Sequence, residues 1–137
     1  MIFVDTGYFI ALFDPDDSLN ARAHAWSRAI REPLVLTDYV LLETVNHFSR
    51  QGDRPRAQAI VDTVLFGGGY VIVPSSVELF HAGLALHRQR PDKDWSLTDC
   101  ISFHVMSDRG ITQAMAHDKH FQQAGFDALL RRDPPAP

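Results

Sequence analysis

The chain has 137 residues, of which 45% are hydrophobic and 22% are charged, and it contains one cysteine. This size and composition predict one soluble globular domain with its own core, and the single cysteine excludes an internal disulfide. The formal net charge of −4 disfavours nucleic-acid binding through overall basic charge but leaves room for a local basic rim.

No stretch approaches the roughly 18 consecutive apolar residues that a membrane span needs. The first residues lack the basic segment of a signal peptide, and Asp5 interrupts the opening apolar run. The lone Cys100 fits a reducing compartment. We therefore expect a cytoplasmic protein without membrane contact.

Short apolar runs alternate with longer helical patterns in the first half of the chain. The expected elements are a strand over 2–5, a helix over 8–13 capped by Thr6, a helix over 20–32, a strand over 34–36, a helix over 38–50 capped by Thr37 or Asp38, and a helix from Pro55 to Phe66. Gly67, Gly68 and Gly69 end the last of these.

The second half continues the same alternation. The expected elements are a strand over 70–73, a helix from the capping box of Ser75 and Glu78 to Gln89, a charged loop over 90–96, a helix over 96–108, a strand over 112–116, a helix over 119–124 and an edge strand over 128–130. We expect one domain over residues 1–132 and a disordered, proline-rich tail over 133–137.

This pattern predicts an α/β fold, in which a mostly parallel sheet of four to five strands is flanked by helices on both faces. Ligands in such folds bind beyond the carboxyl ends of the strands. Asp5 and Asp118 stand at two of these ends. Their side chains are therefore expected to share a site.

Four acidic residues are the candidates for chemistry, namely Asp5, Glu43, Asp99 and Asp118. Divalent cations such as Mg2+ and Mn2+ prefer hard oxygen ligands, and buried carboxylates are costly when no cation neutralises them. Each residue also has a purely structural explanation. Asp5 and Asp118 can cap helices or form turns, Asp99 completes a capping box with Ser96, and a helical glutamate such as Glu43 is usually solvated.

The helix face that carries Glu43 also carries Asn46 and Arg50. This face is polar without being a plain lysine and glutamate stripe. Asn46 can support a ligand of the cation, and Arg50 can contact a phosphate. Lys119 belongs to the same expected basic rim.

Four segments together resemble the PIN-domain ribonucleases and, among them, the VapC-like toxins of type II toxin–antitoxin systems. The segments are Val4–Phe13, Thr37–Asn46, Trp95–Phe103 and Ala116–Phe121 with Gly125 and Phe126, in the order of the family. The resemblance covers nearly all of residues 1–130. It implies a parallel sheet flanked by helices and a Mg2+- or Mn2+-dependent endoribonuclease.

The resemblance also implies roles for individual residues. Asp5, Glu43, Asp99 and Asp118 match the acidic quartet of the family, and Thr6, Asp94 and Thr98 match supporting positions beside it. One departure concerns Ala116, which stands where the family often has a threonine or serine. A hydroxyl that would tune Asp118 is therefore missing.

The expected reaction is metal-assisted hydrolysis of an RNA phosphodiester that leaves a 5′-phosphate and a 3′-hydroxyl. We expect Asp5, Asp99 and Asp118 to be the metal ligands, with Asp5 and Asp99 as the principal ones. Glu43 would orient a water molecule or complete the ligand shell.

Other readings are weaker. His117 and His120 suggest Zn2+, but no matching histidine or cysteine pair exists elsewhere. The triplet Asp5-Thr6-Gly7 occurs in dimeric aspartic proteases, which are nearly all-β. In haloacid-dehalogenase-like phosphatases a second aspartate would stand at Gly7. A non-catalytic module that binds RNA or protein is the main alternative.

The resemblance implies three partners: an RNA substrate, a cognate antitoxin protein and a second copy of the chain in a homodimer. Residues 8–13 and 25–30 offer apolar surface for such contacts, and burial in the core explains that surface equally well. The sequence does not indicate which RNA is cleaved.

Overall fold

The structure, a computed structural model, describes residues 1–137 and contains one five-stranded sheet. Its strands are β1 (Ile2–Val4), β2 (Leu34–Thr37), β3 (Tyr70–Val73), β4 (Gln113–Met115) and β5 (Asp127–Ala128). They lie in the order β3-β2-β1-β4-β5, and all four neighbouring pairs are parallel. The predicted α/β fold with a parallel sheet is confirmed.

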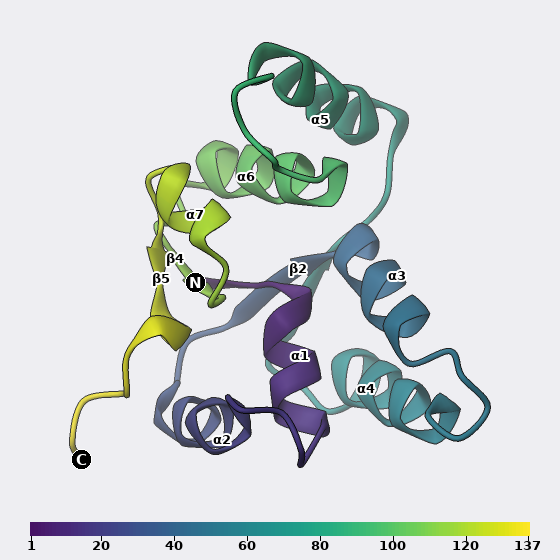
Figure 1. Cartoon of the computed structure of the whole chain (residues 1–137), viewed down its shortest axis with the longest axis vertical. Helices are drawn as coiled ribbons and strands as arrows, with labels where there is room; N and C mark the ends of the chain where they lie inside the picture. Colours follow the sequence, from purple (N-terminus) through teal and green to yellow (C-terminus); the bar gives the residue numbers. More distant parts are fainter.

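Seven α-helices surround the sheet. They are α1 (Thr6–Phe13), α2 (Asn20–Ala29), α3 (Asp38–His47), α4 (Arg54–Phe66), α5 (Val77–Gln89), α6 (Leu97–Arg109) and α7 (Lys119–Gln123), and a 3-10 turn over Leu129–Arg131 follows β5. Figure 1 shows α1, α2 and α4 on one side of the sheet and α5, α6 and α7 on the other. Helix α3 begins at the carboxyl end of β2 and touches α1, α4 and α6.

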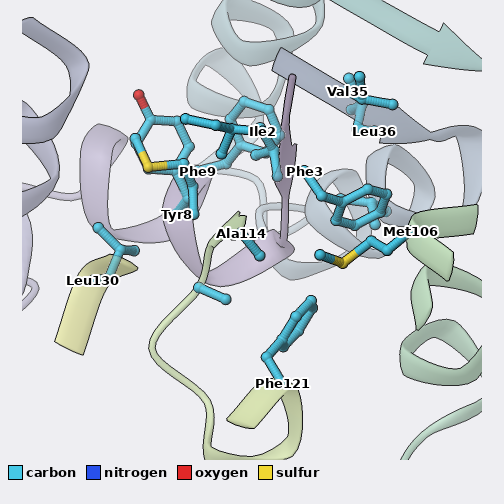
Figure 2. Close-up of a cluster of buried hydrophobic side chains, with 14 of the residues drawn as sticks. Ile2, Phe3, Tyr8, Phe9, Val35, Leu36, Met106, Ala114, Phe121 and Leu130 are labelled. Carbon is cyan, nitrogen blue, oxygen red and sulfur yellow. The ribbon is translucent and has the colours of Figure 1, made fainter. Parts of the chain in front are cut away.

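The central strand β1 is covered on both faces. Ile2, Phe3 and Val4 are buried without a polar position between them, as a strand between two helical layers requires. Figure 2 shows Ile2 on the same side of β1 as Tyr8 and Phe9, and Phe3 on the opposite side. The core therefore fills the space on both sides of this strand.

The strand order places the carboxyl ends of β1 and β4 next to each other. The chain runs outward from β1 through β2 to β3 and then returns to the other side of β1. The backbone N–H of Asp5 donates to the carbonyl oxygen of Met115 at 3.2 Å, which joins the two ends directly. This is the point in a doubly wound sheet where a crevice opens for a ligand.

Several expected boundaries need correction. Helix α2 ends at Ala29 and not at Glu32, because Ile30 adopts an extended backbone. The cap of α5 is Ser76, whose hydroxyl accepts from the backbone of Leu79, so the expected capping box of Ser75 and Glu78 does not form. Ser75 and Ser76 are both suitable capping residues, so the sequence alone does not show which of them caps α5.

The ends of two other elements also differ from the expectation. Asp5, and not Thr6, occupies the position before the first turn of α1. The expected strand over 128–130 is reduced to Asp127–Ala128, because the backbone tightens into the 3-10 turn at Leu129. Leu129 and Leu130 are nevertheless buried, which accounts for their apolar character.

The segment after the 3-10 turn contacts α2. The guanidinium of Arg22 donates to the Asp133 carboxylate at 2.9 Å, and the indole of Trp26 donates to the carbonyl of Arg132 at 2.8 Å. Disorder of residues 133–137 and a domain boundary at 132 stay predictions. None of the helices combines the length and the apolar character that crossing a bilayer would require.

Candidate active site

Asp5 directly follows the central strand β1, at its junction with β4. Its backbone is extended, the residue is 9% exposed, and its side chain does not cap α1. A Cβ atom added at Gly7 would stand 3.8 Å from Asp5 Oδ2, so the turn after Asp5 passes close to the carboxylate. The sheet thus fixes one carboxylate where β1 meets β4.

Asp99 reaches the same region from the first turn of α6. Its backbone N–H donates to Ser96 Oγ at 3.0 Å, and its Oδ2 accepts from the backbone N–H of Ser96 at 3.1 Å. The expected capping box is therefore confirmed. Like Asp5, Asp99 is 9% exposed, and only Oδ2 is engaged by this cap.

Asp118 stands between β4 and α7. Its Oδ1 accepts from the backbone N–H of His120 at 3.0 Å, which starts the short helix. Its side chain is 45% exposed, so this carboxylate is more open to solvent than that of Asp99, whose side chain is 12% exposed. Ala116 at the end of β4 is fully buried, and no hydroxyl supports Asp118 from that position.

Glu43 comes from the second turn of α3. The Thr37 hydroxyl caps this helix by accepting from Val40, and the Thr6 hydroxyl donates to the carbonyl of Val40 at 3.4 Å. The beginning of α1 is thereby joined to α3. Thr6 therefore contacts the backbone of the helix that carries Glu43, and its supporting role stays a prediction.

The electrostatics of Asp5 show that the four carboxylates share one environment. The pKa of Asp5 is raised from 3.8 to about 8, chiefly by burial and then by the charges of Asp99, Glu43 and Asp118, whereas the backbone N–H of Thr6 opposes the rise. Each of the three other carboxylates is thus close enough to act on Asp5.

No lysine or arginine forms an ion pair with any of the four carboxylates. The only side chain that can donate a hydrogen bond to these carboxylates is that of His120. Its Nδ1 lies 3.0 Å from Asp99 Oδ2 and 3.3 Å from Asp118 Oδ1. Four clustered acidic groups with one imidazole leave an excess of negative charge. A bound cation would offset that excess.

The donor set fits a hard divalent cation by charge and by atom type. No three histidine, cysteine, aspartate or glutamate side chains form a ready-made ligand shell, however. Mg2+ usually takes only one or two protein carboxylates and keeps several water molecules. Buried Asp5 and Asp99 can supply those two, and the more exposed Asp118 and Glu43 can act through water.

The remaining predicted residues form no hydrogen bond or ion pair with the four carboxylates. Asn46, Asp94, Arg50 and Lys119 are exposed, and Thr98 is half-buried at the start of α6. None of their side chains forms a hydrogen bond or ion pair within the protein. Their supporting and RNA-binding roles stay predictions.

His120 is a residue of this region that sequence reasoning did not assign to it. His117 and His120 suggested Zn2+ and were set aside for want of a matching pair, whereas the structure places His120 Nδ1 against the carboxylates of Asp99 and Asp118. The S-x-x-D box and the D-x-H spacing are both visible in the sequence. Only the packing of α7 on α6 brings them together.

Comparison with known proteins gives consistent matches over most of the chain. A model of the PIN domain matches residues 2–127. The 23S rRNA-specific endonuclease VapC20 of Mycobacterium tuberculosis, strains CDC 1551 and H37Rv, is 31% identical over 136 residues, which cover 92% of this chain and 95% of the relative.

Two solved structures share the fold. The crystal structure of VapC20 of Mycobacterium tuberculosis, described as a sarcin–ricin loop cleaving toxin, matches with a TM-score of 0.85 and 25% identity over 92% of this chain and 96% of that chain. FitAcB of Neisseria gonorrhoeae matches with a TM-score of 0.65 and 17% identity over 93% of this chain and 96% of that chain. The second match supports the fold alone.

Proposed function

The chain belongs to the PIN domain family, and on this premise we propose that it is a divalent-metal-dependent endoribonuclease that serves as the toxin of a toxin–antitoxin pair. The observation that carries the proposal is the group of four acidic residues without a lysine or arginine partner at the carboxyl end of the parallel sheet. The similarity to an rRNA endonuclease over almost the whole chain supports the same reaction class.

Mg2+ or Mn2+, when bound, supplies positive charge that stabilises the phosphoryl group and makes water a better nucleophile. Asp5 and Asp99 would hold the cation, and Asp118 would join them, directly or through water. Glu43 would orient the attacking water and accept its proton. The water oxygen forms a bond to phosphorus, the bond from phosphorus to the 3′-oxygen breaks, and that oxygen takes a proton from solvent, to which Glu43 returns the one it accepted.

The RNA reaches this crevice over an acidic protein surface, so basic side chains must contact its phosphates locally. Arg50 and Lys119 are exposed and free of internal ion pairs, which suits them to that role. Because a relative is specific for 23S rRNA, a 23S sarcin–ricin stem-loop is the first substrate to test.

The proposed partners are a cognate antitoxin and a second copy of this chain, in the cytoplasm. Tyr8, Phe9 and Trp26 belong to the core and offer no docking surface. Exposed apolar side chains lie instead on α3, α4 and α5, including Leu42, Phe66 and Phe80. We assign protein contacts to these three helices, and the molecular mass in solution tests the homodimer.

An RNA cleavage assay tests the proposed reaction. The wild-type protein should cut a 23S rRNA fragment or total RNA with Mg2+ or Mn2+, leave 5′-phosphate ends, and stop when EDTA is added. Asp5→Asn should lose at least about 100-fold in rate because it removes a charged ligand at the proposed centre.

Asp62→Asn is the matched control, since Asp62 is exposed on α4 and far from the cluster in sequence. It should cleave like the wild type. Full activity of Asp5→Asn, or cleavage that is indifferent to EDTA, would contradict the proposal. Binding of RNA without cleavage under all of these conditions would favour the non-catalytic module.

A further inference from the structure

His120 is not one of the predicted metal ligands, and its side chain does not cap a helix. Its ring is 18% exposed, and its Nδ1 atom lies within hydrogen-bond distance of two carboxylates that come from different elements. The distances are 3.0 Å to Asp99 Oδ2, from the start of α6, and 3.3 Å to Asp118 Oδ1, from the loop after β4. An ionised carboxylate can only accept, so Nδ1 carries the hydrogen in this contact.

The contact engages one oxygen of each carboxylate and leaves the other free. Asp99 Oδ2 accepts from Ser96 and from His120, and Asp118 Oδ1 accepts from the backbone of His120. Neither Asp99 Oδ1 nor Asp118 Oδ2 takes part in a hydrogen bond within the protein. With one oxygen of each group held by His120, the free oxygens have fixed directions.

The position of His120 is itself determined by packing. Its neighbour Phe121 is fully buried and meets the ring of Phe103 on α6 edge-on, with 5.0 Å between the centroids. Gln123 in the next turn accepts from the indole of Trp95 at 3.0 Å. Helix α7 is therefore packed against α6 and the loop before it, which brings the imidazole of His120 next to Asp99.

We propose that His120 is a positioning residue that orients Asp99 and Asp118 for a divalent cation through the contacts of its Nδ1–H with Asp99 Oδ2 and Asp118 Oδ1. This inference rests on the proposed function, because it assigns a cation to the same site. Hydrogen bonds from residues behind the ligands commonly change metal affinity by about 10- to 100-fold. His120 takes this place in the present site without being a ligand.

Calorimetric titration of the RNA-free protein with Mn2+ tests the inference without reference to catalysis. His120→Ala should bind Mn2+ about 10- to 100-fold more weakly than the wild type. His120→Asn should restore most of the affinity, because an asparagine amide nitrogen can stand where Nδ1 stands. His120→Gln, whose amide lies one carbon further out, should not.

His87→Ala, at an exposed position on α5, serves as the control and should bind like the wild type. Far-UV circular dichroism establishes that each variant is folded, and the asparagine and glutamine variants carry the comparison if His120→Ala unfolds. Equal or tighter binding by His120→Ala, or equal losses in His120→Asn and His120→Gln, would overturn the inference. A wild-type protein that binds no Mn2+ would instead overturn the proposed function.

Discussion

At the residue scale, Asp5 combines burial with the like charge of three neighbouring carboxylates. These effects raise its pKa to about 8, so the metal-free protein holds a proton on Asp5 at neutral pH. A cation must displace that proton before both oxygens can serve as ligands. Metal binding and proton release are therefore coupled at this residue.

The raised pKa of Asp5 predicts how stability depends on pH in the absence of metal. Between its ordinary value of 3.8 and about 8 the native state keeps a proton that the unfolded chain releases. The contribution of Asp5 is complete below pH 3.8 and is lost as pH rises toward 8, by at most about 1.4 kcal/mol per pH unit. Urea unfolding in EDTA from pH 4.5 to 8.5 measures it.

Asp5→Asn cannot titrate, so its free energy of unfolding should fall less steeply with pH than that of the wild type. Asp62→Asn should keep the wild-type slope, because Asp62 is exposed. If Asp5→Asn and the wild type share the same slope, Asp5 does not titrate in this range and the account of its environment is wrong.

The acidic quartet was predicted from the local position of each member together with the resemblance to PIN-domain ribonucleases. Asp5 and Asp118 follow strands, Asp99 completes a capping box, and Glu43 lies on a polar helix face. The contact of His120 with Asp99 could not be predicted from the sequence, because the two residues are 21 positions apart and meet only through tertiary packing. Short motifs therefore located the carboxylates but not the group that holds two of them.

At the element scale, the close approach of α5 to α6 depends on Gly83. A Cβ atom at this buried position would collide with Cγ1 of Ile101, which is itself 1% exposed. The glycine therefore allows two helices to pack at short range. Because α6 carries Asp99, this packing also bears on the site.

Gly83→Ala should destabilise the protein by about 1–3 kcal/mol, because overpacking outweighs the helix propensity of about 1 kcal/mol that alanine gains. Chemical unfolding of the two proteins measures the difference. Gly52→Ala is the control, since a Cβ atom there meets nothing within 4 Å. A Gly83→Ala protein at least as stable as the wild type would show that the helices can separate without cost.

The helices and their order along the chain could be predicted from the sequence, whereas the residues at which several helices begin or end could not. Periodicity located α3, but its end at His47 and not at Arg50 depends on the backbone of Phe48, whose ring is buried. Likewise, Ser75 and Ser76 are equivalent as caps until Leu79 selects Ser76. Local sequence patterns therefore predict that an element forms, and tertiary contacts determine the residues at which it begins and ends.

At the scale of the whole molecule, the order of the strands creates the site. Asp5 and Asp118 are 113 positions apart in the chain, and the return of the chain across the sheet places β4 beside β1. Continuous apolar strands predicted a parallel sheet correctly. The strand order itself, which decides which loops meet, came from the three-dimensional structure.

The central claim is that the four carboxylates form one site for a divalent cation. A crystal structure with Mn2+, located by its anomalous scattering, tests this claim most directly. The account predicts an ion between Asp5 and Asp99 in the wild type and its loss in Asp5→Asn. An ion bound elsewhere, or none at an Mn2+ concentration that supports RNA cleavage, would contradict it.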